Sequence, residues 1–232
     1  MDISIVIPLY NSGGRILPLY HSLIDILSFN NSYEIIFVDD GSQDITLEII
    51  KEVGEKDSHI RILELKKNMG QYTALFEGYK YSKGKIVISL DDDAFDEVEY
   101  IPKFIRKIEE GYDIVLGWRK KKGYPFLRKI ISFLFNAVIS LIIGRRIHDI
   151  GSSLKAKNRK AVDILISLGE LTRFLQYYKY FRIAELRIPN KYSKKFPTRY
   201  NIIKLIKSAV LILKNNIFNE GKLNLTSKEM DI

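Results

Sequence analysis

Short apolar runs alternate with helical patterns along the first half of this 232-residue chain, and this alternation limits the fold more than any other feature. Five runs are rich in β-branched residues and nearly continuous in apolar character, which is typical of strands covered on both faces. They are Ile3–Ile7, Glu34–Val38, Ile60–Leu65, Lys85–Leu90 and Asp113–Gly117. Between the last two, Ile101, Phe104 and Ile108 recur at helical spacing. This order predicts βαβ units, and hence an α/β fold whose mostly parallel central sheet is flanked by helices.

The second half of the chain predicts more helix than strand. The expected elements are the helices Phe126–Ile143, Ala161–Leu168 and Ile202–Phe218 and the strand Ile183–Ile188. No internal repeat or low-complexity linker separates these elements from the first half. We therefore expect a single domain over residues 1–218, followed by a polar tail at 219–232.

An excess of positive charge predicts an anionic partner. The 37 Lys and Arg residues outnumber the 28 Asp and Glu residues by nine, so the formal net charge is +9 at pH 7. Nucleic acid, an acidic membrane surface or a phosphorylated ligand would each satisfy this charge. Cysteine is absent, which excludes disulfides, a thiolate nucleophile and Cys-ligated metals, and which fits a reducing compartment.

Neither a secretory signal nor a membrane span is expected. Met1–Ser4 contains no basic segment before the first apolar run. The most apolar stretch, Ile130–Ile143, would rise about 21 Å as a helix, which is short of the roughly 30 Å hydrocarbon core of a bilayer.

Polar clusters follow three of the expected strands, at the edge where parallel sheets bind their ligands. These clusters are Pro8–Ser12, Asp39–Ser42 and Asp91–Asp93, and together they predict one acidic cleft. In extended chain Asp91 and Asp93 point to the same side, and paired oxygen ligands suit Mg²⁺ or Mn²⁺ bridging a diphosphate. A lone acidic triplet also fits a solvated turn that caps the next helix. Three clusters at one edge favour the ligand site.

Further motifs narrow the kind of ligand. Asp40 is placed to accept a hydrogen bond from the base or ribose of a nucleotide, although Asp39–Ser42 also fits an ordinary turn. The chain has neither a P-loop nor a Gly-x-Gly-x-x-Gly fingerprint, so ATPases and dehydrogenases that use these phosphate cradles are excluded.

Five segments occur in an order that resembles the family 2 glycosyltransferases: VIPLYNS, EIIFVDDGSQDIT, KNMGQYTALFEG, GKIVISLDDD and HDIGSSLKAKNR. Over about residues 1–205 the chain is most similar to the polyprenyl-phosphate branch, which includes dolichol-phosphate mannosyltransferase. The resemblance implies a GT-A fold, a divalent Mg²⁺ or Mn²⁺ ion, and a nucleotide-diphosphate sugar donor. It also implies inverting transfer to a polyprenyl phosphate at the cytoplasmic membrane face. Residues 1–117 would then form the nucleotide-sugar-binding half and 118–218 the acceptor and membrane-facing half.

The resemblance assigns roles to individual residues. The nucleotide-sugar-binding positions are Pro8, Tyr10, Val38, Asp40, Asp91, Asp92, Asp93 and Arg119. The metal would be held by Asp91 and Asp93. The candidate catalytic residues are Asp93, Asp149 and Arg119. The acceptor side would comprise Ser152, Ser153, Lys155 and Arg199.

The chain departs from the family pattern at three places. Ala94-Phe95 stands where the family has Leu-Gln after the acidic triplet, and a phenylalanine cannot ligate a cation. Ser12 replaces the usual glutamate after Asn11, and Ser152–Leu154 replaces the usual Ser-Gly-Phe. These changes bear on donor identity and metal affinity rather than on the fold.

The acceptor decides whether a general base is needed. A phosphate acceptor is already an anion, whereas a sugar hydroxyl needs a base, for which Asp149 is the candidate. A soluble glycosyltransferase acting on a glycan or other hydroxyl is therefore the main alternative. A basic nucleic-acid-binding module is the remote one. We expect no nucleic acid partner, because no recognised motif is present and acidic clusters lie at the strand ends.

The expected helix Phe126–Ile143 is apolar almost all round and has basic residues on both sides, including Lys129 and Arg145. Such a helix can lie in an anionic membrane interface, or it can be buried in the core or in a dimer. The resemblance favours the interface, with the protein on the cytoplasmic face of the membrane. A homo-oligomer or a separate membrane-anchoring partner is left open.

Overall fold

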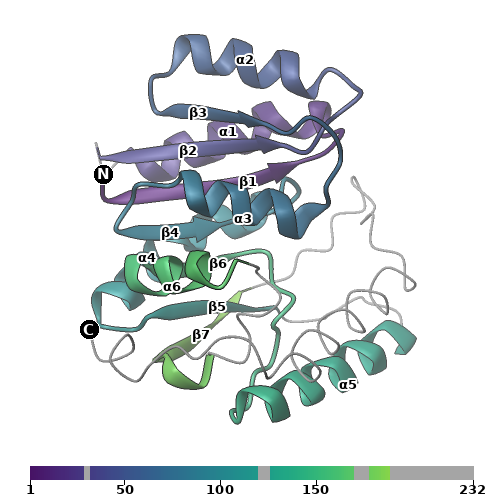
Figure 1. Ribbon diagram of the computed structural model, residues 1–232, viewed down its shortest axis with the longest axis vertical. Helices are drawn as coiled ribbons and strands as arrows, with labels where there is room; N and C mark the ends of the chain where they lie inside the picture. Colours follow the sequence, from purple (N-terminus) through teal and green to yellow (C-terminus); the bar gives the residue numbers. More distant parts are fainter. Residues whose placement is uncertain (29–31, 120–125, 170–177, 189–232) are drawn as a thin grey trace.

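The computed structural model describes residues 1–28, 32–119, 126–169 and 178–188 (Figure 1). Its strands are β1 (Ile3–Leu9), β2 (Tyr33–Asp39), β3 (Ile60–Glu64), β4 (Ile86–Ser89), β5 (Ile114–Arg119), β6 (Lys155–Asn158) and β7 (Ile183–Ile188). Its helices are α1 (Gly13–Leu27), α2 (Thr46–Lys56), α3 (Gln71–Tyr81), the 3-10 helix η1 (Phe95–Tyr100), α4 (Ile101–Glu109), α5 (Phe126–Ile143) and α6 (Arg159–Ser167). The predicted helix Ile202–Phe218 and the tail 219–232 lie outside the described residues.

The strands form one mixed sheet in the order β3-β2-β1-β4-β6-β5-β7. All neighbouring pairs are parallel except those of β6, which runs antiparallel to both β4 and β5. The predicted α/β fold with a mostly parallel sheet is confirmed. From β1 the chain builds toward β2 and β3 on one side, whereas β4 lies on the other side. The switch point where ligands of open α/β sheets bind therefore lies between the carboxyl ends of β1 and β4.

Helices cover both faces of the sheet, which explains why the strands are apolar on both sides. Figure 1 shows α3 and α6 in front of the sheet and α1 and α4 behind it. Ile5 packs with buried side chains of α1 and α4, such as Leu19 and Phe104. The next residue, Val6, packs on the opposite face with Ala74 of α3 and with α6. The two hydrophobic cores thus follow from the two-residue periodicity of the strands.

A glycine lets α3 lie close to the sheet. A Cβ at Gly78 would lie 2.3 Å from Cγ1 of Val6 and 3.0 Å from Cγ2 of Val38. Such distances leave no room for any side chain, so the helix can approach the strands only where glycine stands. Because α3 follows β3, its amino-terminal end lies at the carboxyl edge of the sheet.

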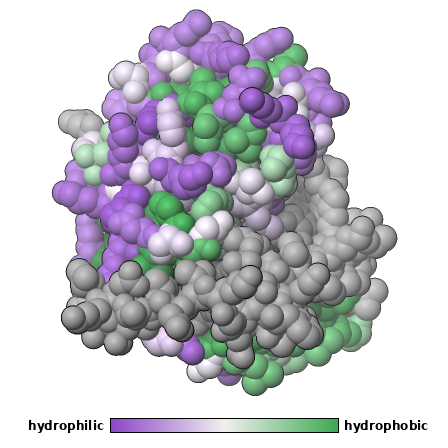
Figure 2. Space-filling model, in the orientation of Figure 1, coloured by the Kyte–Doolittle hydropathy of each residue, from purple (hydrophilic) through white to green (hydrophobic). Residues whose placement is uncertain are grey.

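Helix α5 coincides with the predicted helix and buries only part of its apolar surface. Ile139 and Ile143 are fully buried, and Nδ2 and Oδ1 of the buried Asn136 contact Ser132 and the backbone N–H of Ile150. The side chains on its other side are exposed; they are Phe126, Ile130, Phe133, Leu134, Val138 and Leu141, here called the α5 stripe. Figure 2 shows hydrophobic surface at the lower edge of the molecule, where Figure 1 places α5. Within the described ranges, none of the helices combines the length and apolar character needed to cross a bilayer.

Candidate active site

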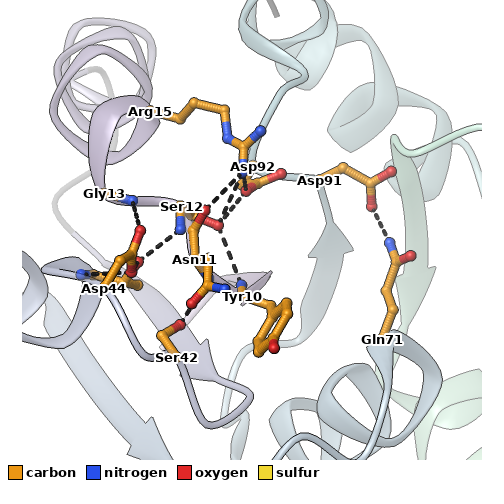
Figure 3. A network of polar contacts seen from close by, with 11 residues as sticks. Tyr10, Asn11, Ser12, Gly13, Arg15, Ser42, Asp44, Gln71, Asp91 and Asp92 are labelled. Carbon is orange, nitrogen blue, oxygen red and sulfur yellow. Dashed lines mark hydrogen bonds and ion pairs between the residues drawn. The ribbon is translucent and has the colours of Figure 1, made fainter. Parts of the chain in front are cut away.

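The segments after β1 and β4 contact each other across the switch point (Figure 3). The Ser12 hydroxyl, which follows β1, donates a hydrogen bond to Oδ2 of Asp92, which follows β4. Nη2 of Arg15, in the first turn of α1, lies 2.8 Å from the same carboxylate oxygen. Because Arg15 and Ser12 are both buried, this polar cluster is shielded from solvent. The contacts turn Asp92 toward α1 and join the two strand ends.

Asp91 points the other way, toward α3 (Figure 3). Nε2 of Gln71, the first residue of α3, donates to its Oδ1 over 2.7 Å. Burial, reinforced by the negative charges of nearby acids with Asp93 first among them, raises the pKa of the Asp91 carboxyl to about 7. The positive charge of Arg119 opposes this rise. The carboxylate therefore lies where added positive charge would stabilise its ionised form.

The predicted metal ligands Asp91 and Asp93 have the chemistry that a divalent cation requires. Mg²⁺ and Mn²⁺ prefer oxygen ligands and keep several positions for phosphate oxygens and water. In the part of the chain that the structure describes, no group of three or more His, Asp or Glu side chains is arranged to hold a metal ion. The charge of Asp93 raises the pKa of Asp91, so the two carboxylates lie near each other, and their oxygens fit a divalent cation that also binds diphosphate oxygens.

The end of β2 adds two carboxylates, Asp39 and Asp40, and the structure gives them different environments. Asp40 is buried, and its two oxygens accept the backbone N–H groups of Met69 and Gly70 over 2.6 and 2.8 Å. Asp39 accepts from the backbone N–H of Ser42 through Oδ2, whereas its buried Oδ1 has no hydrogen-bond partner among the described residues. The predicted nucleotide ligand Asp40 therefore fixes the segment before α3, and Asp39 keeps an unused acceptor.

The other predicted nucleotide-binding residues divide into buried and exposed. Pro8 and Val38 are opposite each other in the β1–β2 pairing and are buried in the sheet. Tyr10 exposes 37% of its surface at the end of β1. The turn below it is held by Asn11, whose φ of 49° is unusual for a residue other than glycine and whose Oδ1 accepts the backbone N–H of Gln43. Tyr10 thus places a partly exposed aromatic ring at the carboxyl edge of the sheet.

An ion pair with a buried carboxylate joins the end of β5 to the segment before β6. Nε of Arg119 lies 2.8 Å from Oδ2 of Asp149, and Nη2 lies 3.2 Å from Oδ1, so the contact is bidentate. The Arg119 backbone N–H also donates to this carboxylate, and Nη2 donates to the carbonyl of Gly151. The Asp149 side chain is only 2% exposed. The structure therefore brings these two candidate catalytic residues together as one unit.

The predicted acceptor-side residues lie next to this ion pair, apart from Arg199, which lies outside the described residues. Ser152 is buried against Gly117 of β5. The hydroxyl of Ser153 donates to Oε2 of Glu97 in η1, a contact that links the acceptor-side segment to the helix after the acidic triplet.

Two lysines of β6 complete the interior of the site. Burial, reinforced by the positive charge of Lys157, lowers the pKa of Lys155 to about 8, and the charges of Tyr79, Asp91 and Asp149 oppose this fall. Burial lowers the pKa of Lys157 to about 7, and its Nζ donates to the hydroxyl of Tyr79 over 3.0 Å. Lys155, which the sequence assigns to the acceptor side, thus remains mostly charged at neutral pH near two carboxylates.

Three polar residues of this edge are not among the residues predicted from the sequence, namely Arg15, Gln71 and Glu97. Gln71 lies inside the segment KNMGQYTALFEG, and its place at the start of a helix facing β4 was the available signal. Arg15 is a lone cation on the apolar side of a helix, three residues after Ser12, which is a weaker signal. The sequence contains no comparable signal for Glu97.

We predict that Gly117→Ala disturbs the acceptor side. A Cβ at this position would lie 2.3 Å from Oγ of Ser152, 2.8 Å from Cδ1 of Ile188 and 3.1 Å from the carbonyl oxygen of Leu154. Such overpacking costs about 1–3 kcal/mol of unfolding free energy, which urea denaturation would measure. Gly14→Ala is the control, because no atom lies within 4 Å of a Cβ there. Equal losses of stability in the two variants would contradict the prediction.

Comparisons with known proteins place this geometry in a family. The model of glycosyl transferase family 2 matches residues 4–165. The undecaprenyl-phosphate 4-deoxy-4-formamido-L-arabinose transferase of Proteus mirabilis is 31% identical over 209 residues, which cover 88% of this chain and 64% of that protein. The dodecaprenyl-phosphate galacturonate synthase of Rhizobium johnstonii is 30% identical and is matched over 96% of this chain and 68% of its own length. The chain thus spans about two thirds of the length of these two relatives.

Solved structures of low sequence identity share the fold. Glucosyl-3-phosphoglycerate synthase of Mycobacterium tuberculosis superposes with a TM-score of 0.67 at 17% identity, over 95% of this chain and 82% of that one. The same enzyme has been crystallised with Mn²⁺ and uridine diphosphate. TarS of S. aureus in complex with UDP-GlcNAc superposes with a TM-score of 0.57 at 20% identity, over 100% of this chain and 70% of that one. The fold is therefore GT-A, and the chain belongs to glycosyl transferase family 2.

Proposed function

We propose that this protein transfers a sugar, with inversion, from a nucleotide-diphosphate sugar to a polyprenyl phosphate. The observation that carries the proposal is the acidic edge at the switch point, where Asp92 contacts Ser12 after β1, Asp91 contacts Gln71 at the start of α3, and the charge of Asp93 acts on Asp91. The two curated relatives named above act on undecaprenyl and dodecaprenyl phosphate, which supports the acceptor class. In this proposal residues 1–117 bind the donor, 118–218 bind the acceptor, and 219–232 are a tail.

The donor would lie across the carboxyl ends of β1, β2 and β4. Tyr10 offers an exposed ring for the base. Oδ1 of Asp39 is a buried hydrogen-bond acceptor, and an N–H or O–H group of the nucleotide would pair with this atom once it became accessible. Asp91 and Asp93 would hold the divalent cation, Mg²⁺ or Mn²⁺. This cation supplies electrostatic stabilisation of the leaving diphosphate.

The pairing of Arg119 with Asp149 favours a phosphate acceptor. A carboxylate that accepts two guanidinium N–H groups and a backbone N–H is poorly placed to remove a proton. Asp149 therefore serves best as the residue that orients Arg119 toward the developing negative charge. Lys155, whose charge interacts with both Asp91 and Asp149, adds positive charge for an anionic acceptor. A hydroxyl acceptor would need a base that this arrangement does not offer through Asp149.

The α5 stripe supports peripheral association with an anionic membrane at the cytoplasmic face. Phe133, Leu141 and their neighbours form one exposed apolar side of the helix, and the exposed Arg145 and Arg146 follow its carboxyl end. An amphipathic surface of this kind buries its apolar side chains in the interfacial region while cations contact lipid phosphates. A polyprenyl phosphate resides in that interface, so this surface would deliver the protein to its acceptor.

We predict that Phe133→Ser with Leu141→Ser weakens binding to anionic vesicles by about tenfold or more, because each buried aromatic or leucine side chain contributes roughly 1.5–3 kcal/mol. The measurement is cosedimentation with vesicles of phosphatidylethanolamine and phosphatidylglycerol. Ile45→Ser is the matched control, since Ile45 is 57% exposed but lies before α2. Unchanged vesicle binding in the double variant would reject the α5 stripe as the membrane surface.

The function itself is tested with a panel of radiolabelled nucleotide sugars, undecaprenyl phosphate, and MgCl₂ or MnCl₂. The expected result is label in an organic-extractable lipid that depends on the cation. Label that appears only in an aqueous glycan, when hydroxyl acceptors are supplied instead, would replace the lipid-phosphate acceptor with a hydroxyl acceptor. Absence of transfer with every sugar on the panel would contradict the proposal.

A further inference from the structure

Glu97 is a buried carboxylate that neither the sequence motifs nor the proposed chemistry uses. It lies in η1, which begins two residues after Asp93, and it is 8% exposed. A single oxygen, Oε2, accepts both the hydroxyl of Ser153 and the backbone N–H of Leu154, the latter over 3.2 Å. Glu97 therefore links the helix that follows the acidic triplet directly to the acceptor-side segment.

The segment held by Glu97 is itself packed against β5. The carbonyl of Leu154 accepts the backbone N–H of Gly117 over 3.1 Å, and Ser152 lies in the space that the missing side chain of Gly117 leaves free. Two residues beyond Gly117 is Arg119, which binds Asp149. Hydrogen bonds and short stretches of chain thus connect the acidic triplet, through Glu97, to the ion pair.

Hydrogen bonds, rather than an ion pair, hold the buried carboxyl of Glu97 in place. Among the described residues, no Lys or Arg forms an ion pair with it. Burial raises the pKa of its carboxyl, and the Ser153 hydroxyl and the charge of Arg119 offset part of this rise. An amide oxygen at the position of Oε2 would accept the same two hydrogen bonds without the cost of burying a charge.

We infer that Glu97 is a positioning residue that fixes the acceptor-side segment, residues 152–154, relative to the acidic triplet Asp91–Asp93. A movement of the acidic triplet on the donor side is then accompanied by a movement of residues 152–154 on the acceptor side. What the two halves bind rests on the proposed function, whereas the tether rests on the two hydrogen bonds alone.

Hydrogen exchange of the Leu154 amide tests the tether without any substrate. Glu97→Ala removes the acceptor, so we expect this amide to exchange at least about tenfold faster than in the wild type. Glu97→Gln keeps an acceptor oxygen, so its exchange is expected to stay within about threefold of the wild type. Glu99→Ala is the matched control, because Glu99 is an exposed acid on the same 3-10 helix. Ser153→Ala, which removes only one of the two bonds, should leave the Leu154 amide protected.

Kinetics then separate positioning from a merely structural effect. With the donor and polyprenyl phosphate identified by the transfer assay, Glu97→Ala is expected to raise the KM for the acceptor at least fivefold while the KM for the donor changes less than twofold. Glu97→Gln should restore the acceptor KM. Wild-type exchange at Leu154 in Glu97→Ala, or equally fast exchange in Glu97→Gln and Glu97→Ala, would overturn the inference. If the wild type transfers no sugar at all, the proposed function fails and the exchange measurement still decides the tether.

Discussion

Asp91→Asn is expected to lower the rate of sugar transfer by about 10²–10³-fold, the loss that follows removal of one electrostatic group from a preorganised site. Asparagine keeps the size and the contact with Gln71 but cannot carry the negative charge that a divalent cation needs. The measurement is the transfer assay described above. Asp25→Asn is the control, since Asp25 is an exposed acid on α1, far along the chain from the edge. Full activity in Asp91→Asn would refute the metal assignment.

The same substitution should change how stability depends on pH. The Asp91 carboxyl has a pKa of about 7 in the folded protein against an ordinary value of 3.8, so the folded state holds this proton more tightly than the unfolded state. Its contribution to stability is therefore fully present below pH 4 and is lost as the pH rises through 7. Without metal, the melting temperature of the wild type should fall over this range more steeply than that of Asp91→Asn. If the melting temperatures of the two proteins changed with pH in parallel, the raised pKa of Asp91 would be contradicted.

Metal affinity should follow the opposite course. The cation requires the ionised carboxylate. As the pH rises toward 7, the apparent Kd for Mn²⁺ is therefore expected to fall by up to about tenfold per pH unit, and above pH 7 it should level off. Calorimetric titration of the protein with MnCl₂ between pH 5.5 and 8 measures this directly. A Kd that does not change over that range would exclude Asp91 as the titrating ligand.

Arg119→Ala is expected to have the second large effect, on both stability and turnover. It leaves the carboxylate of Asp149 buried without its bidentate partner, and breaking a buried pair from one side costs about 3–5 kcal/mol of unfolding free energy. Turnover should fall about 10²-fold or more, because the guanidinium no longer faces the developing charge. Urea denaturation and the transfer assay provide the two measurements.

The double variant Arg119→Ala with Asp149→Ala distinguishes the two effects. Removing both charges eliminates the uncompensated carboxylate, so much of the lost stability should return while turnover stays low. Arg106→Ala is the control, since the Arg106 side chain is 83% exposed and its contact with Glu110 is on the surface. Recovery of turnover together with stability in the double variant would show that Arg119 acts only through the fold.

The order of the elements could be predicted because strands covered on both faces leave long apolar runs in the sequence. All six predicted strands are present, and the predicted helix Phe126–Ile143 matches α5. The strand that was missed is β6, four residues with the sequence KAKN. No apolar run marks this strand, since two of its four residues are lysines. Lys157 is nevertheless buried, because its Nζ contacts Tyr79, a residue 78 positions earlier in the chain. Its strand conformation depends on pairing with β4 and β5 rather than on local preference.

The candidate site could be predicted as a place but not as a set of contacts. Polar clusters after apolar strands indicate the carboxyl edge, and the sequence pattern led to Asp91–Asp93 and Asp149. The partners of these acids come from α1, α3 and β5, at separations that no local pattern encodes. Asp40 is predicted to bind the nucleotide, and in the structure both its oxygens accept backbone N–H groups of the segment before α3.

The residues alone predicted the architecture, the family and the edge of the sheet where the candidate site lies, because alternating apolar patterns and turn residues act locally. Which side of α5 is buried, which of two adjacent aspartates is held by the backbone, and which cation faces Asp149 depended on how the helices pack on the sheet. These choices bring together side chains tens of residues apart, and burial sets their charge and their partners. Glu97 is the clearest case, since an acid without a motif became the link between the two halves of the site only when the chain was folded.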